Sequence, residues 1–340
     1  MTQPGLPLPP HRALDAQHAR AAIPSITAVV PMLNEAENAG VLLLALRDAL
    51  AAQSERFEIV VVNDGSRDAT REVVLAAAPA CHVRYIELSR NFGKEAALSA
   101  GLEAARGDVV LTLDGDFQHP ISELPAMLAR WREGYEMVYG VRAGRRDEGL
   151  AKRLGTAVFY GLLTRGSEVD IPPGAGDFRL MDRKVVDALL RLPERSRFMK
   201  GLYGWVGFRS IPFTYRVEPR AHGRSSFSMP RLVALAVAAI TAFSYVPLRM
   251  IGAVGVLVSL AALGYGGWVI VETLVGGGAP PGYPTIVVSI MFFSGVQLLS
   301  LGVLGEYLGR VFEEVKQRPN FLVADDVSFS DLPARPPRAR

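Results

Sequence analysis

Short apolar runs rich in β-branched residues alternate with segments of helical periodicity through the first two thirds of the chain. The runs that predict strands are Ile26–Val30, Glu58–Val62, Val83–Leu88, Val109–Leu113 and Glu136–Val141. Between them, apolar residues recur at the spacing of one helix face, as in the leucines from Leu42 to Leu50. Strands that alternate with helices predict an α/β fold, in which a mostly parallel sheet is covered on both faces.

The pattern changes after Leu232. The apolar run Leu232–Val246 is shorter than the ~20 residues that cross a bilayer core, and it predicts an interfacial helix. Met250–Val271 and Tyr283–Gly305 carry no charged residue and predict two transmembrane helices. A pair of buried core helices is the alternative.

Charged residues orient these two stretches. The connection Gly276–Tyr283 is short and uncharged, whereas basic residues flank the outer ends. The flanking residues are Arg231, Arg249, Arg310, Lys316 and Arg318. By the positive-inside rule, both termini and the α/β domain are expected on the cytoplasmic side.

The predicted organisation has five parts. They are a disordered lead-in (1–22), an α/β domain (23–228), an interfacial juxtamembrane helix (229–248), a two-helix transmembrane anchor (249–310) and a cytoplasmic juxtamembrane segment with a flexible tail (311–340). The lead-in lacks the apolar core of a signal peptide. The tail from Ala324 onward is rich in proline and arginine.

Composition and charge narrow the choice of partners. Of the 340 residues 49% are hydrophobic, and the formal net charge is +3. Because that charge is small and the basic residues form no stripe, we expect a membrane surface and no nucleic acid as partner. The single cysteine, Cys81, cannot form an intramolecular disulfide, so nothing indicates an oxidising compartment.

Three polar clusters each follow directly on an expected strand. They are Pro31–Glu35, Asn63–Asp68 and Asp114–Gln118. Ligands of open α/β sheets bind beyond the carboxyl ends of the strands, so the clusters are candidates for one site. Asp114 and Asp116 would face the same side of an extended strand, and hard divalent cations prefer such oxygen ligands. A solvated turn is the alternative.

The other two clusters have structural explanations as well as functional ones. Asp64 can accept a bond from a nucleotide base or ribose, or the cluster is only a turn that caps the next helix through Asp68 or Ser66. Asn34 and Glu37 have the spacing of an N-cap and capping box. The first cluster therefore also fits a simple helix start.

Six motifs extend the pattern across the chain. They are Val30–Glu35, Asp64–Asp68, Leu88–Lys94, Asp114–Pro120, Gly176–Leu180, and Gly305–Arg310 leading to Arg318 and Pro319. In this order they resemble the inverting nucleotide-sugar glycosyltransferases of the GT-A fold. Within that fold they are most similar to the polyprenyl-phosphate glycosyltransferases, the group that contains dolichyl-phosphate mannose synthase and the bactoprenol glucosyltransferases. The resemblance runs from about Ser25 to Leu322.

The resemblance implies inverting transfer of a single hexose, best matched by glucose from a UDP-sugar, to undecaprenyl or another polyprenyl phosphate at the inner (cytoplasmic) membrane. The donor-binding residues it implies are Pro31, Asn34, Glu35, Asp64, Lys94, Asp114, Arg142 and Arg153. The residues implied for Mg²⁺ or Mn²⁺ are Asp114, Asp116 and Gln118, and those implied for catalysis are Asp116, Asp177 and Arg179. Users of GDP-mannose and UDP-aminoarabinose share much of the pattern.

Two positions depart from the family pattern. Asn63 stands where the first of two aspartates is usual. Ser226 stands where the family has a lysine in the Gly223–Phe227 segment, and neighbouring Arg224 is the cation that remains. Acceptor contacts are therefore less well defined than donor contacts.

The acceptor chemistry predicts a role for arginine. A phosphate monoester has a second pKa of roughly 6, so it is largely dianionic and needs no general base. The predicted acceptor-binding residues are Arg216, Arg220, Arg224 and Ser226. Arg179 is a further candidate fork, and Asp177 is expected to orient Arg179 or the sugar during in-line attack. Attraction to lipid headgroups, or simple solvation, is the alternative role for these arginines.

Two other functions fit parts of the pattern. A processive polysaccharide synthase shares the fold and the membrane setting, but the Gln-x-x-Arg-Trp motif of those enzymes does not occur in the sequence. A non-catalytic membrane scaffold would be free to lose the metal carboxylates, which this chain keeps. Glu306 and Arg310, one turn apart, either pair with each other or meet a lipid headgroup. The sequence leaves open whether the chain forms a homo-oligomer.

Overall fold

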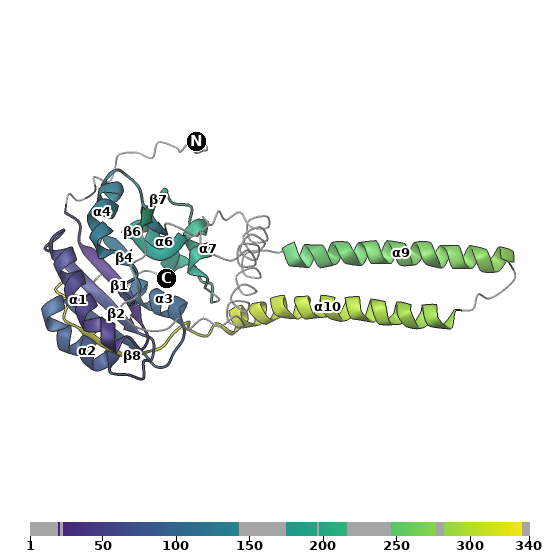
Figure 1. The fold of residues 1–340 in the computed structure, drawn as a ribbon, viewed down its shortest axis with the longest axis horizontal. Coiled ribbons are helices and arrows are strands. Elements are labelled where there is room, and N and C mark those ends of the chain that lie inside the picture. Colours follow the sequence, from purple (N-terminus) through teal and green to yellow (C-terminus); the bar gives the residue numbers. More distant parts are fainter. Residues whose placement is uncertain are drawn as a thin grey trace.

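The structure, a computed structural model, describes residue 20 and residues 23–142, 175–195, 197–215, 246–276 and 282–334 of the chain. An α/β domain occupies one end of the molecule, and a long pair of helices projects from it (Figure 1). All three polar clusters of the sequence lie in the α/β domain.

Eight strands form one sheet within the described part of the chain, in the order β7-β5-β6-β4-β1-β2-β3-β8. Their bounds are β1 Ile26–Met32, β2 Phe57–Asn63, β3 Val83–Leu88, β4 Val109–Thr112, β5 Met137–Arg142, β6 Ala175–Asp182, β7 Ser210–Tyr215 and β8 Val323–Ser328. β1 pairs in parallel with β2 and β4, β2 with β3, and β5 with β7, whereas β6 and β8 run antiparallel to their neighbours. The five expected strands and the mostly parallel sheet are therefore confirmed.

Helices cover both faces of this sheet. Their bounds are α1 Ala36–Ala51, α2 Thr70–Ala77, α3 Lys94–Ala104, α4 Leu124–Arg132, α6 Arg183–Arg191 and α7 Met199–Trp205, with short 3-10 turns η1 Pro79–Cys81 and η2 Ile121–Glu123. Side chains of β1 alternate between the faces: Ala28 and Val30 pack with α1 and α4, whereas Val29 packs with α3, α6 and α7. Each face of the sheet thus has its own apolar core.

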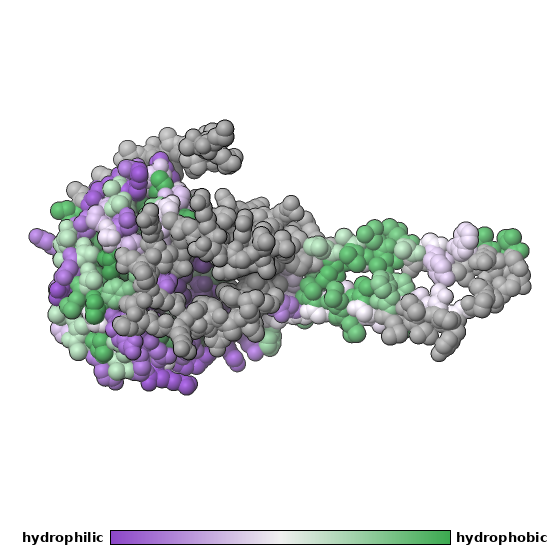
Figure 2. Space-filling model, in the orientation of Figure 1, coloured by the Kyte–Doolittle hydropathy of each residue, from purple (hydrophilic) through white to green (hydrophobic). Residues whose placement is uncertain are grey.

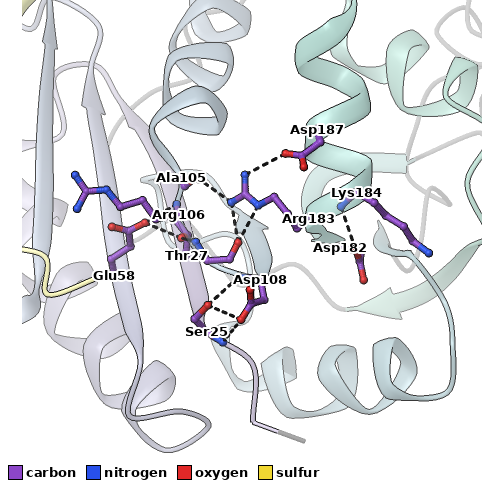
Figure 3. A network of polar contacts seen from close by, with 11 residues as sticks. Ser25, Thr27, Glu58, Ala105, Arg106, Asp108, Asp182, Arg183, Lys184 and Asp187 are labelled. Carbon is purple, nitrogen blue, oxygen red and sulfur yellow. Dashed lines mark hydrogen bonds and ion pairs between the residues drawn. The ribbon is translucent and has the colours of Figure 1, made fainter. Parts of the chain in front are cut away.

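A buried polar network closes the edge at which the central parallel strands begin (Figure 3). Arg183, at the start of α6, donates to the carbonyl of Gly107 at 2.9 and 2.7 Å and to that of Ala105 at 2.9 Å. Nearby, Thr27 Oγ1 donates to Glu58 Oε1 at 2.8 Å and accepts from the Gly107 N–H at 2.8 Å. The polar groups at this edge are therefore satisfied by one another.

The start of α1 differs from the prediction. α1 begins at Ala36, and Glu37 forms no capping box with Asn34, whose φ of 55° is left-handed. Side chains from the loop after β2 bond to the free N–H groups instead. Ser66 Oγ accepts from Asn34 at 2.9 Å, and an Asp68 oxygen accepts from the first residue of α1 at 3.1 Å. The capping prediction is wrong because acceptors distant in sequence reach this helix end.

Strand β8 contradicts the prediction of a flexible tail from Ala324. It pairs with β3, and Arg84 holds Asp326 by two bonds, Nε to Oδ1 at 3.0 Å and Nη2 to Oδ2 at 2.6 Å. Farther along, Ser330 Oγ donates to Glu58 Oε2 at 2.7 Å. A polar segment can form such an edge strand because backbone bonds and ion pairs hold it without an apolar face.

The projecting pair consists of α9 (Val246–Gly276) and α10 (Tyr283–Lys316). Large apolar side chains on both helices are exposed, among them Leu257, Trp268, Leu298 and Leu308. Figure 2 shows hydrophobic residues along the part of the pair nearer to the α/β domain and again at its far tip. Among the residues that the structure describes, no helix combines the length and the hydropathy of a membrane span. The expected interfacial helix (229–248) lies outside the described residues, except for 246–248, which begin α9.

Candidate active site

The loops that carry the three polar clusters meet at the carboxyl edge of β1, β2 and β4, as predicted. Asn34 Oδ1 accepts from the N–H of Arg67 at 2.8 Å, which joins the loops after β1 and β2. Gly115 lies against the first of these loops, because a Cβ there would stand 3.4 Å from Met32 and 3.5 Å from Glu35. The clusters therefore surround the switch point between β1 and β4, where open α/β sheets bind ligands.

Asp64, directly after β2, holds the loop that precedes α3. Its Oδ1 accepts from the N–H of Phe92 at 2.7 Å, and its Oδ2 accepts from that of Gly93 at 2.9 Å. Gly65, with a φ of 71°, allows the close approach, since a Cβ there would stand 2.6 Å from the nitrogen of Asn91. Burial raises the pKa of Asp64, and the two N–H bonds oppose that rise. Contact of Asp64 with a nucleotide base stays a prediction. Each carboxylate oxygen has a second lone pair that can accept a hydrogen bond from the base.

Lys94, the first residue of α3, joins the turn after β4 to strand β6. Its Nζ lies 2.6 Å from Asp114 Oδ1 and 2.7 Å from Asp177 Oδ2. Burial alone would raise the pKa of Asp177, but the Lys94 ammonium outweighs it and holds that pKa well below its usual range. Burial would likewise lower the pKa of Lys94, and the two carboxylates raise it instead. Lys94 and Asp177 are therefore both charged at neutral pH.

The two carboxylates predicted to bind a metal, Asp114 and Asp116, lie in a turn. β4 ends at Thr112, so the alternation of an extended strand does not reach Asp114 and Asp116, and that part of the reasoning is wrong. Asp116 Oδ1 accepts from the N–H of Gln118 at 3.2 Å, which keeps these two residues together. No group of three His, Cys, Asp or Glu side chains within the described residues is arranged to hold a metal. Mg²⁺ bound with a nucleotide commonly uses one or two carboxylates plus phosphate oxygens, and this turn can provide two.

His119 holds this turn through a hydrogen bond and ring contacts. Its Nδ1 accepts from the N–H of Asp114 at 3.0 Å. Its ring stacks on Phe178 of β6, with centroids 5.0 Å apart, and meets Tyr215 of β7 edge-on at 6.0 Å. The turn is therefore held by an aromatic cluster that belongs to the apolar core on the α1 and α4 side.

Arg179 is not arranged as predicted. It is 3% exposed, and its guanidinium lies 4.1 Å from the ring centre of Tyr203 and 5.2 Å from that of Tyr139. The ion pair of Asp177 is with Lys94, at 2.7 Å, and Arg179 adds a weaker attraction. The alternation of residues along the strand predicts that Asp177 and Arg179 share one face. It does not predict that aromatic side chains from α7 and β5 surround Arg179. The structure thus gives Arg179 a role inside the domain, in place of the expected phosphate fork.

Glu95 is a candidate residue that the sequence analysis missed. Its Oε2 accepts from the N–H of Met199, the first residue of α7, at 3.1 Å. Burial raises the pKa of Glu95 to about 7, and the negative charge of Asp177 adds to the rise. Glu95 therefore changes its charge near neutral pH, close to the pair formed by Lys94 and Asp177. Its place directly after the Leu88–Lys94 motif is the only signal in the sequence.

The other predicted residues divide into two groups. Arg142 ends β5, which runs parallel to β4 because β6 lies antiparallel between them, so Arg142 and Asp114 share one edge of the sheet. Pro31, Asn34 and Glu35 belong to the end of β1 and the loop after it, at the same edge. Five predicted residues lie outside the described part of the chain: Arg153, Arg216, Arg220, Arg224 and Ser226.

Family models match both parts of the chain: residues 27–190 match Glycosyl transferase family 2, and residues 246–311 match the GtrB C-terminal hairpin. The SfII prophage-derived bactoprenol glucosyl transferase of Shigella flexneri is 42% identical over 299 residues, which cover 88% of this chain and 97% of that protein. The chain belongs to glycosyl transferase family 2. The predicted glycosyltransferase with an α/β domain of the GT-A type is thereby confirmed.

This family 2 glycosyltransferase is also similar to other proteins over most of its length. An uncharacterized glycosyltransferase of Synechocystis is 43% identical over 309 residues, 91% of this chain and 97% of that one. Among solved structures, glucosyl-3-phosphoglycerate synthase of Mycobacterium tuberculosis, in complex with Mn²⁺, UDP and glucosyl-3-phosphoglycerate, matches 64% of this chain and 78% of its own. Its identity is 20% and its TM-score 0.42.

Proposed function

We propose that this glycosyltransferase moves a single glucose from UDP-glucose to a polyprenyl phosphate, with inversion at the anomeric carbon. The chain matches a protein named bactoprenol glucosyl transferase over nearly its whole length. The observation that carries the proposal is the cluster of Lys94, Asp114 and Asp177 at the carboxyl edge of the sheet. Lys94 remains 42% exposed, so these charges face the site of ligand binding and do not merely tie the core together.

The donor side of the reaction follows from the turn after β4. Asp114 and Asp116, with Gln118 beside them, would hold Mg²⁺ or Mn²⁺. Such an ion, when bound, neutralises the diphosphate that leaves as the sugar bond breaks. The Lys94 ammonium contacts Asp114 and can donate a hydrogen bond to the diphosphate. Arg142 at the end of β5 and Arg153 complete the proposed donor contacts.

The acceptor side needs no protein base. A phosphate monoester is mostly dianionic at neutral pH, since its second pKa is roughly 6. Asp177 is held as an anion by Lys94, and its Oδ1 is buried and accepts no bond from the described residues. We assign this carboxylate the task of orienting the sugar while the phosphate attacks in line. The predicted acceptor residues Arg216, Arg220 and Arg224 would hold the phosphate.

We also place α9 and α10 in the membrane as two spans, with the α/β domain and both termini on the cytoplasmic side. Met250–Val271 and Tyr283–Gly305 carry no charged residue, and several of their side chains lie outside the described ones. Large apolar side chains on both helices are exposed, an arrangement that suits lipid better than water. Such an anchor keeps the enzyme at the membrane, so it meets its lipid acceptor by diffusion along the membrane surface and not through the bulk solution.

Incubation of membranes that contain the protein with a panel of radiolabelled nucleotide sugars tests this proposal. We expect label from UDP-glucose in the extracted lipid, and we expect Asp177→Asn to lose it. Label from GDP-mannose or UDP-aminoarabinose alone would change the donor, and label in a polymer would indicate a processive synthase. Retention of anomeric configuration, or a glycosyl group trapped on Asp177, would refute the in-line mechanism. No lipid label from any sugar would refute the proposal and favour a scaffold.

A further inference from the structure

A groove of about 1100 Å³ separates the cytoplasmic end of α10 from the loop that precedes α3. Arg90 and Phe92 line it on the side of that loop, Arg195 lines it after α6, and the last turns of α10 together with Arg318 line the other side. A hydrogen bond joins the two sides of the groove: Glu314 Oε1 of α10 accepts from the N–H of Arg195 at 2.8 Å. The groove is therefore part of the contact between the hairpin and the α/β domain.

Basic side chains outnumber acidic ones in the lining of this groove. The basic residues are Arg90, Arg195, Arg310, Lys316 and Arg318, and two glutamates accompany them. Two of these cations are held over aromatic rings, Arg90 at 4.0 Å from the ring centre of Phe92 and Lys316 at 3.9 Å from that of Phe312. Asp114, Asp116 and Asp177 do not line the groove, so it is distinct from the candidate active site.

The position of the groove along α10 indicates what it meets. On the proposed function, the uncharged stretch of α10 lies in the bilayer and ends at Gly305. The lining of the groove begins at that same residue and continues to Lys316, Arg318 and Leu322. It therefore lies at the depth of the lipid headgroups, where basic side chains attract anionic lipids.

We propose that this groove binds the phosphodiester headgroup of an anionic membrane lipid, at a site separate from those for the donor and the acceptor. The inference rests on the membrane placement proposed above. Guanidinium groups match phosphate oxygens with two donors each, and Arg195 and Arg318 bring such groups from the α/β domain and from the end of α10. A bound headgroup would link these two parts of the molecule.

The groove also borders the active site through one loop. Phe92 lines the groove, and its N–H is held by Asp64 of the candidate donor site. Two residues later, Lys94 contacts Asp114 and Asp177. An anionic headgroup bound against Arg90 and Phe92 would therefore restrain the loop that positions Lys94.

Native mass spectrometry of the full chain in detergent, titrated with dihexanoyl-phosphatidylglycerol, tests the proposal. We expect saturable binding that is tighter than that of dihexanoyl-phosphatidylcholine or of inorganic phosphate. Arg195→Gln combined with Arg318→Gln should weaken it by roughly 30-fold, because it removes two cations that face the anion. The control Arg132→Gln removes an exposed arginine at the end of α4, which contributes no residue to the groove, and should leave binding unchanged.

Several outcomes would overturn the proposal. One is equal phosphatidylglycerol binding by the wild-type protein and the double variant. Another is equally tight binding of inorganic phosphate, which would make the groove a site for soluble phosphate. A third is a preference for farnesyl phosphate that the double variant loses, which would make the groove part of the acceptor site. If the double variant does not fold, Lys316→Gln decides, with an expected weakening of roughly fivefold.

This measurement counts bound lipid and does not depend on sugar transfer. Failure to form any lipid-linked glucose would therefore refute the proposed function and leave the headgroup site standing. A negative result for headgroup binding would in turn leave the proposed reaction standing.

Discussion

Substitution of Glu95 by glutamine is expected to remove a pH-dependent loss of stability from the α/β domain. Burial, with Asp177 as a second cause, raises the pKa of Glu95 from 4.5 to about 7. At pH values below 4.5 the folded and unfolded states both hold the proton. As the pH rises, the unfolded state releases its proton first, so the folded state loses stability until its own carboxyl ionises near pH 7.

The size of this loss follows from the two pKa values. Each pH unit between the folded and the unfolded pKa corresponds to about 1.4 kcal/mol, so ionisation of Glu95 costs the folded state about 3 kcal/mol above pH 7. For a domain of this size, about 1 kcal/mol shifts the Tm by roughly 2–4 °C, which gives a difference of roughly 6–12 °C between Glu95→Gln and the wild type. The glutamine carbonyl can still accept from the N–H of Met199, so that bond is retained.

Thermal unfolding of the detergent-solubilised protein, followed by tryptophan fluorescence between pH 5 and pH 8, measures this difference. The Tm advantage of Glu95→Gln should be small at pH 5 and should grow to its full size at pH 8. Glu103→Gln, an exposed position on the same helix, is the matched control and should show no such trend. An advantage of the same size at both ends of the range would refute the reasoning, because ionisation of Glu95 would then not be its cause.

Four further predictions follow from the site, the polar network and the hairpin. Asp116→Asn should abolish formation of the lipid-linked sugar without lowering the Tm, and excess chelator should have the same effect on the wild type; activity that survives chelation would exclude a metal role. Arg183→Met should lower the free energy of unfolding by about 3 kcal/mol, because two buried carbonyls lose a charged donor, while the KM for the donor stays unchanged. Arg220→Ala should raise the KM for the lipid acceptor far more than that for the donor, and wild-type activity should fall below about pH 6 as the acceptor phosphate takes up a proton; equal changes in both KM values would contradict this role. Gly278→Cys in a Cys81→Ser background should react with an impermeant thiol reagent in intact cells, and reaction only after the membrane is opened would reverse the proposed topology.

The parallel half of the sheet could be predicted from the sequence because its strands are continuous apolar runs. β1 and β2 are buried at nearly every position, which is the pattern of strands covered on both faces. β6 was not predicted, since Asp177 and Arg179 interrupt its apolar residues. β7 was not predicted either, because it lies at the edge of the sheet and its exposed positions alternate with partly buried ones.

The candidate site could be predicted as a set of loops but not as a set of contacts. The carboxyl ends of parallel strands share one edge, so the meeting of the clusters around Asn34, Asp64 and Asp114 follows from the fold class. The contact of Lys94 with Asp177 depends on the insertion of β6 antiparallel beside β4. No local pattern in the sequence carries that long-range placement.

Strand β8 attaches the hairpin to the α/β domain, which explains its presence better than burial of its side chains does. The side chains of β8 are mostly exposed, so it adds little to either core. It does tie α10 to the sheet, together with the bond from the N–H of Ser89 to the carbonyl of Leu322 at 2.9 Å. Ser89 opens the loop that leads to Lys94, so any shift of α10 would be passed to a charged group of the active site. On the proposed function the acceptor phosphate stands at the surface of a bilayer, and catalytic groups on a freely hinged domain would meet it at varying heights. We therefore expect the pairing of β8 with β3 to limit changes in the distance between the active site and the hairpin.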